Sequence, residues 1–185
     1  GSFFENWNER AYEVCLELLD KFFTEGASGL ESRVVLGQLS GSRDVVLFEG
    51  RPSELRTKFT SPEALNEFLQ AHADANESPV FRSTGAAVDY ASSVTGVSEN
   101  TRLLTAIFSD MIDSETDAKI RQQEGSRMLA SLKRYQEQGG GLALYFTAPE
   151  ETGRWQRILD QAGFEPGSTV IQNSLVARPQ LPRFD

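Results

Sequence analysis

Two polar residues of the chain lie where side-chain oxygens could bind a divalent cation. The first is Asp110, which follows Ser109 directly after the almost entirely apolar run Arg102–Phe108. Such a run is typical of a buried central strand in a parallel sheet. Open α/β sheets bind ligands beyond the carboxyl ends of their strands, and an Asp there can hold a hard cation through oxygen. A simpler role for Asp110 is to stabilise a turn by accepting backbone N–H groups.

The second residue is Thr84, in the segment Arg82–Ala86 at the expected start of a small-residue helix over 84–94. A Thr at a loop-to-helix junction is commonly an N-cap. Its hydroxyl could instead serve as a cation ligand beside Asp110. We expect the two side chains to converge at the edge of the sheet where the strands end.

The elements that must position these residues alternate between helices and strands. Apolar spacing and turn residues predict helices over 11–22, 61–69, 84–94 and 149–162, and a long helix between 113 and 139. Strands are predicted over 33–39, 44–48, 102–108, 142–146 and 169–177, the first two forming an antiparallel hairpin. This alternation predicts a single α/β domain over 1–185, a mainly parallel central sheet with one antiparallel edge strand and helices on both faces.

Composition excludes several classes of function. The 185 residues hold 18 Lys and Arg against 27 Asp and Glu, a formal net charge of −9, without a basic cluster. Nucleic acids and anionic membranes are therefore poor partners, and no apolar run approaches the roughly 20 residues of a membrane span. The single Cys15 and the single His72 exclude an internal disulfide and argue against Cys-based zinc sites, multi-His centres and Ser-His-Asp triads. One free cysteine slightly favours the cytoplasm, but the compartment stays open.

Common nucleotide and hydrolase motifs are absent. The chain contains neither a G-x-x-x-x-G-K-[ST] phosphate loop, a G-x-G-x-x-G fingerprint nor a G-x-S-x-G nucleophile elbow. Gly139–Gly141 follow an expected helix and precede an expected strand, which indicates a helix stop.

An acidic loop offers a second metal hypothesis. Asp113, Glu115, Asp117 and Glu124 imitate the ligand spacing of a calcium loop. Ala118 stands where the sharp turn of such a loop requires Gly. Negative residues before a helix are explained equally well by the helix dipole.

The order of these features resembles a von Willebrand factor A (VWA) domain over roughly 9–177: helix, hairpin, helix, Ser-Thr-Gly at a helix start, an apolar strand ending in Ser-Asp, then helix, strand, helix, strand. Such domains carry a metal-ion-dependent adhesion site. It is built from an Asp-x-Ser-x-Ser loop after the first strand, a Thr in a second loop and an Asp in a third loop, often within Ser-Asp-Gly. Thr84 matches the second loop, and Asp110 matches the third, with Met111 where Gly is usual.

The chain departs from this pattern at its beginning. It contains no Asp-x-Ser-x-Ser, and no strand precedes its first helix, although that strand is central in the family. One explanation is that Gly1-Ser2-Phe3 ends a Ser-Gly-Ser-Phe loop, which makes Ser2 the last serine of the motif. The other is that Gly1-Ser2 was introduced by cloning and that the chain is a differently built member without the metal site.

The resemblance implies a protein–protein interaction module rather than an enzyme. Ser2, Thr84 and Asp110 would hold Mg²⁺, or Mn²⁺ or Ca²⁺ as substitutes. Because hydroxyl ligands leave the ion electrophilic, an open coordination position could accept an acidic side chain of a partner protein. The alternatives are a metal-independent scaffold in a larger complex and a small α/β hydrolase using Asp110 and Asp113. The hydrolase is disfavoured because these loops lack an obvious His or Lys to serve as its acid–base partner. The partner's identity and the oligomeric state are left open.

Overall fold

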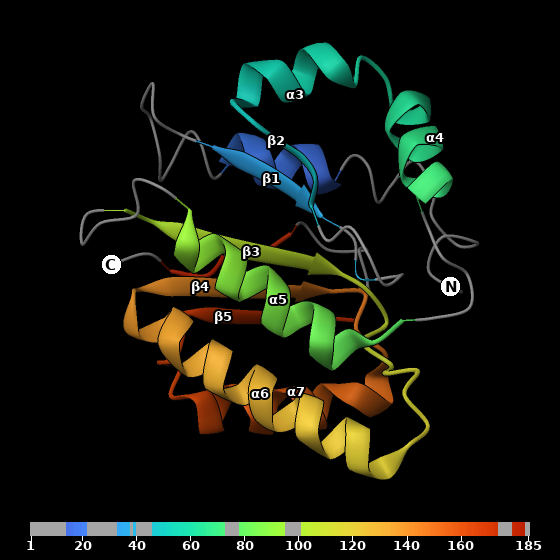
Figure 1. The fold of residues 1–185 in the computed structure, drawn as a ribbon. Helices are drawn as coiled ribbons and strands as arrows, with labels where there is room; N and C mark the ends of the chain where they lie inside the picture. Colours follow the sequence, from blue (N-terminus) through green and yellow to red (C-terminus); the bar gives the residue numbers. More distant parts are fainter. Residues whose placement is uncertain are drawn as a thin grey trace. The chain divides into compact units, whose positions relative to one another are not determined.

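The computed structural model describes residues 14–21, 33–37, 39, 46–72, 78–94, 101–173 and 179–183. The chain divides into two compact units, Gly1–Ser78 and Pro79–Asp185, which we describe separately (Figure 1). The expected first helix is helical over its described residues, 14–21. No described helix is long and apolar enough to cross a membrane.

The first unit contains the predicted hairpin. Strands β1 (Val34–Gly37) and β2 (Val46–Gly50) pair antiparallel as a separate two-stranded sheet, with an irregularity between Leu36 and Gly37. The prediction that the hairpin adds an edge strand to the parallel sheet is therefore not confirmed for the described residues.

Two helices follow the hairpin. Helix α4 (Pro62–His72) begins as predicted, because the Ser61 hydroxyl accepts the Ala64 N–H at 3.2 Å. The short helix α3 (Pro52–Lys58) was not predicted, although Pro52 at its first turn is a common start signal. One buried cluster of this unit is Phe59 and Leu65, with Leu36, Leu47, Leu55 and Phe68 packed against them.

The second unit is built on a parallel sheet. Strands β3 (Leu103–Phe108), β4 (Gly140–Tyr145) and β5 (Thr169–Gln172) lie in the order β3-β4-β5. Strand β4 is central, and all six of its residues are buried. The expectation that 102–108 forms the central strand is wrong for this sheet, because β3 is its outer strand and exposes Ala106.

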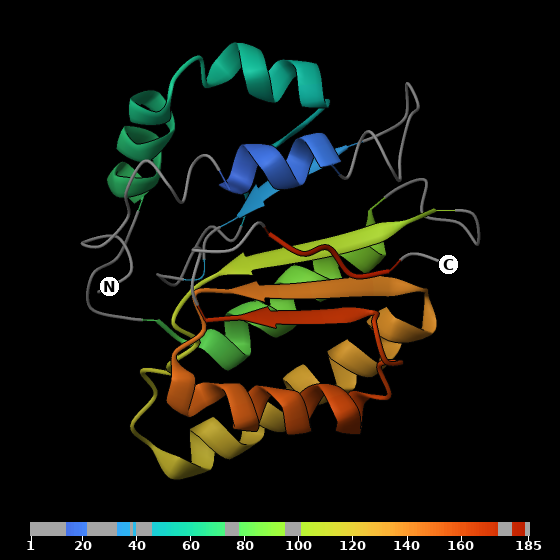
Figure 2. The ribbon, with the colours of Figure 1, turned by 180° about the vertical axis from the view of Figure 1, so that it is seen from behind.

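Helices α5 (Val80–Ser93), α6 (Ala118–Glu137) and α7 (Pro149–Ala162) form one layer, in which α6 contacts both α5 and α7. Because β3-α6-β4 and β4-α7-β5 advance in the same direction, right-handed connections put both crossover helices on one face of the sheet. On the side away from α5, Figure 2 shows the segment 179–183. The predicted cover of helices on both faces is therefore not confirmed among the described residues.

The α6 side chains explain why this layer packs closely. Tyr135 is fully buried, and its hydroxyl donates to the Gly141 carbonyl at 2.9 Å and accepts from Thr105 Oγ1 at 3.0 Å. A Cβ on Gly85 of α5 would lie 3.3 Å from Met128 Cα, so the predicted small-residue helix packs closely on α6. Ile120, an apolar residue in the first turn of α6, is 44% exposed.

Candidate functional site

The carboxyl ends of β3, β4 and β5 meet at one edge of the sheet, which we call the carboxyl edge. Ser109 and Asp110 follow β3, and hydrogen bonds tie them to the loop that follows β4. The Ser109 N–H donates to the Tyr145 carbonyl at 3.0 Å, and the Ala148 N–H donates to the Asp110 carbonyl at 2.9 Å. The candidate residue Asp110 therefore lies in a loop that is fixed by its neighbour.

The Ser109–Met111 turn is locally specified. Ser109 Oγ accepts the Met111 N–H at 3.0 Å, and Asp110 Oδ1 accepts the Ile112 N–H at 3.1 Å. Both are short polar side chains that bond to the backbone two residues later. Met111 has a φ of 62°, the left-handed region that favours glycine, and its side chain is fully buried. The simpler role of Asp110, turn stabilisation, is confirmed, and it leaves open a second role.

The loop after β4 supplies polar atoms that sequence reasoning missed. Thr147 is fully buried, and its Oγ1 has no hydrogen-bond partner. Its carbonyl accepts the Asn173 side-chain amide at 2.8 Å, and the same amide nitrogen donates to Thr152 Oγ1 at 2.7 Å. Asn173 follows β5 directly, and Thr147 follows β4 after one residue, just as Asp110 follows β3 after Ser109. The preceding Phe146, with a φ of 67°, carries no comparable signal.

Thr84 is not at a helix start. Helix α5 begins at Val80, so the predicted start at 84 is wrong by four residues. Thr84 lies inside the helix, is fully buried and has no hydrogen-bond partner for Oγ1. A buried hydroxyl in this state requires an explanation, such as a bound water or ion. Ser92 Oγ, near the other end of the same helix, is in the same state.

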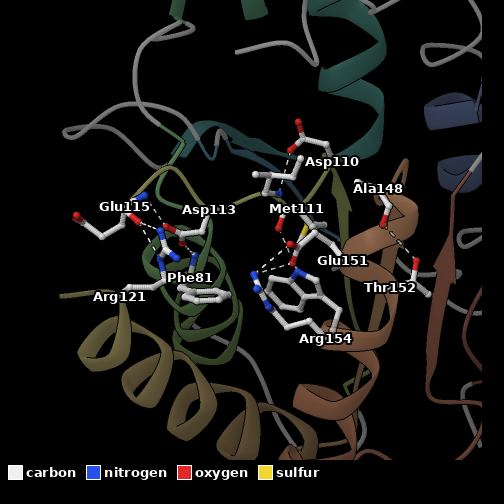
Figure 3. A network of polar contacts seen from close by, with 12 residues as sticks. Phe81, Asp110, Met111, Asp113, Glu115, Arg121, Ala148, Glu151, Thr152 and Arg154 are labelled. Atoms are coloured by element: carbon white, nitrogen blue, oxygen red, sulfur yellow. Dashed lines mark hydrogen bonds and ion pairs between the residues drawn. The ribbon is translucent and has the colours of Figure 1, made fainter. Parts of the chain in front are cut away.

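The early start of α5 has a cause that is remote in sequence. Its N-cap residue is Pro79, which provides no side-chain cap. The Phe81 N–H at the helix start instead donates to Asp113 Oδ2 at 2.9 Å. Asp113 Oδ1 accepts the Glu115 N–H at 2.8 Å, so both oxygens of this carboxylate accept backbone donors (Figure 3).

Two further acidic residues of this loop also accept backbone N–H groups. Glu115 Oε1 accepts the Asp117 N–H at 2.8 Å, and Asp117 is the N-cap of α6 through Lys119 and Ile120. Glu124, the last ligand of the calcium-loop hypothesis, forms an ion pair with Arg127 at 3.1 Å. Within the described residues, no group of three or more His, Cys, Asp and Glu side chains could hold a metal ion. A site built mainly from hydroxyls would not contain such a group.

The start of α7 closes the other side of the Asp110 loop (Figure 3). Trp155 is fully buried, and its indole N–H donates to the Met111 carbonyl at 3.3 Å. Its ring lies 5.9 Å from that of Phe81 in an edge-on arrangement. Glu151, only 9% exposed, binds Arg154 through both carboxylate oxygens at 3.0 and 3.1 Å. The Trp155 hydrogen bond ties the Asp110 loop to α7.

The three predicted metal ligands thus have different outcomes. Asp110 lies at the predicted edge, and Thr84 lies in α5 rather than at its start. Ser2 falls outside the described residues. Because Thr84 Oγ1 has no hydrogen-bond partner, it does not bond to Asp110 directly. The convergence of Thr84 and Asp110 on one ion stays a prediction.

Comparison with known proteins gives no family. No protein-family model, curated protein or solved structure matches the chain.

Proposed function

We propose that the protein is a protein–protein interaction module that resembles a VWA domain and binds its partner at the carboxyl edge. The sheet topology supports this proposal. A doubly wound sheet of order 3-2-1-4-5-6 that lacks its first strand leaves a two-stranded and a three-stranded piece. Among the described residues, the sheets β1-β2 and β3-β4-β5 have these sizes. The proposed whole is a three-layer α/β sandwich.

The conformation of Met111 is a second support. The resemblance puts Met111 at the glycine of the Ser-Asp-Gly loop, and its φ of 62° is one that glycine adopts without strain. A methionine there fits only because the surrounding contacts hold it, including the Trp155 hydrogen bond to its carbonyl. The backbone of this loop is therefore compatible with the glycine of the family's sequence pattern.

The proposed ion is Mg²⁺, held by Asp110 and Thr84; the third predicted ligand, Ser2, lies outside the described residues. The observation that carries this assignment is the fully buried Thr84 hydroxyl, whose oxygen has no hydrogen-bond partner. Oxygen ligands of low charge suit Mg²⁺ and leave a coordination position for another oxygen. The ion would supply positive charge on an acidic protein, and we propose that it attracts a carboxylate of the partner. Mn²⁺ and Ca²⁺ are the expected substitutes.

Thermal unfolding with and without Mg²⁺ tests this function. An ion present at 100 times its Kd stabilises by about 2.7 kcal/mol, which is about 5 to 10 °C for a chain of this size. Asp110→Asn removes the charge but retains an oxygen for the Ile112 N–H, so the shift should disappear without loss of the fold. The matched control is Asp160→Ala, in the last turn of α7, which should keep the full shift.

A metal-independent scaffold of the same fold is the second candidate. It is favoured by the acidic loop, where Asp113 and Asp117 already accept backbone donors. In that case no divalent ion would change the melting temperature of the parent protein or of Asp110→Asn. Because both Asp113 oxygens are occupied in this way, we do not propose a catalytic pair with Asp110.

A further inference from the structure

Three aromatic rings of the first unit surround one ammonium group. Lys58 Nζ lies 5.4 Å from the ring centre of Phe48, 5.6 Å from that of Phe59 and 4.7 Å from that of Phe68. The rings come from β2, from the end of α3 and from α4 (Figure 1). A cation within about 6 Å of a ring centre is attracted by the ring's electrons. Here three such attractions act on one cation.

The three rings are inclined to one another. Phe48 and Phe59 are 6.3 Å apart with an interplanar angle of 71°, and Phe59 and Phe68 are 5.0 Å apart at 57°. They therefore do not stack into a flat surface, and each contacts the same cation. Phe59 itself is buried together with Leu65, and Phe68 packs against these two residues, so the surroundings of the rings are apolar.

The attraction between the Lys58 ammonium and these rings is modest. Its residue is exposed, and within the described part of the chain no carboxylate forms an ion pair with it. A primary ammonium is compact and strongly hydrated, so contact with rings competes with water. A methylated ammonium is larger and more weakly hydrated, and aromatic cages are the known solution for binding it.

We propose that Phe48, Phe59 and Phe68 form a binding site for a methylated ammonium group, which Lys58 occupies in the free protein. The ligand class is a quaternary ammonium, either on a trimethylated lysine side chain or on a choline-type molecule. The site lies within the first unit and is independent of the proposed ion site at Asp110.

Lys58→Ala in the full chain opens the proposed site. We expect choline and Nα-acetyl-trimethyllysine amide to bind this variant saturably, measured by NMR shifts of the phenylalanine rings, and to bind the parent protein at least about fivefold more weakly. The neutral isostere 3,3-dimethylbutanol should bind about tenfold more weakly than choline, because cation–π attraction requires the charge. A preference of about tenfold for the lysine derivative identifies a peptide ligand, and equal affinity identifies a choline-type ligand.

The controls separate a built site from general stickiness. Adding Phe68→Leu to Lys58→Ala keeps an apolar side chain but removes the closest ring, and should weaken choline binding about three- to fivefold or more. Lys133→Ala, an exposed lysine of α6, should bind no more choline than the parent protein. Circular dichroism establishes that each variant is folded, and Lys58→Gln replaces Lys58→Ala if it is not. Equal binding of choline and its neutral isostere, or no binding by a folded Lys58 variant, overturns the proposal.

Discussion

Replacing Met111 by Gly and by Ala should reverse the usual order of stability of these two residues. Met111 is fully buried, and its φ is 62°. Truncation of a buried methionine to alanine costs about 2–5 kcal/mol through lost contacts and the cavity left behind. Glycine loses the same contacts and one further methyl group, but it relieves the left-handed backbone. Both variants should therefore be less stable than the parent protein, with glycine the better of the two.

The magnitude follows from two opposing terms. A non-glycine residue in the left-handed region costs about 1–2 kcal/mol, and glycine loses about 0.5–1 kcal/mol in backbone entropy on folding. These two terms leave Met111→Gly above Met111→Ala by about 0–1.5 kcal/mol in free energy of unfolding, a margin that the loss of the alanine methyl group reduces. Met128 is the matched control, because it is equally buried but lies inside α6. At this position the Met128→Gly variant should be less stable than Met128→Ala by about 1 kcal/mol.

Urea unfolding of the four variants measures these differences. Fluorescence of the buried Trp155 and far-ultraviolet circular dichroism should give coincident transitions, which justifies a two-state free energy. The expected result is a difference between glycine and alanine of opposite sign at 111 and 128. If Met111→Ala is the more stable of its pair by about 1 kcal/mol, the left-handed conformation at this loop is wrong.

Three further predictions concern other parts of the chain. Tyr135→Phe should lower the free energy of unfolding by about 2 kcal/mol, because Thr105 and Gly141 each lose a hydrogen bond. Adding Thr105→Val to this variant should cost less than Thr105→Val costs alone, and strict additivity of the two effects would show that the Thr105–Tyr135 hydrogen bond is absent. Gly163→Ala should lower the melting temperature, since the φ of 89° at this helix end suits glycine, whereas Gly153→Ala within α7 should raise it; equal effects would contradict the assignment. Burial raises the pKa of the Cys15 thiol from 9.0 to about 11. Because the thiol keeps its proton more tightly in the folded chain, its contribution to the free energy of unfolding is complete below about pH 9 and is lost as the pH rises toward 11. At pH 8 a disulfide reagent should therefore react about 100-fold more slowly with the folded than with the urea-unfolded chain. Equal rates would refute this prediction.

The elements that were predicted correctly carry their signals locally. Helix α7 runs from Pro149 to Ala162 as expected, because Pro begins it and Gly163 ends it in a left-handed conformation. The apolar run after Arg102 is a strand, β3. Its place in the sheet was wrong, because an apolar run reports burial of side chains and not which strands lie on either side. The fully buried β4 holds the central place in this sheet.

The candidate site was predictable only in part, for the same reason. Asp110 lies two residues after the end of β3, so its place at the carboxyl edge follows from the chain order. The start of α5 does not follow from the chain order, because the Phe81 N–H in its first turn is capped by Asp113, which lies 32 residues later in the sequence. The left-handed conformations of Met111 and Phe146 also depend on tertiary contacts rather than on residue type.

We propose that the carboxyl edge binds a divalent ion between Thr84 and Asp110. Titration with paramagnetic Mn²⁺, followed by the broadening of backbone amide signals, measures where an ion binds. We expect the amides of Thr84, Asp110 and Thr147 to broaden first, those around Asp160 to be spared, and Asp110→Asn to abolish the effect. Broadening that is uniform, or that centres on residues 113–117 and persists in Asp110→Asn, would contradict it.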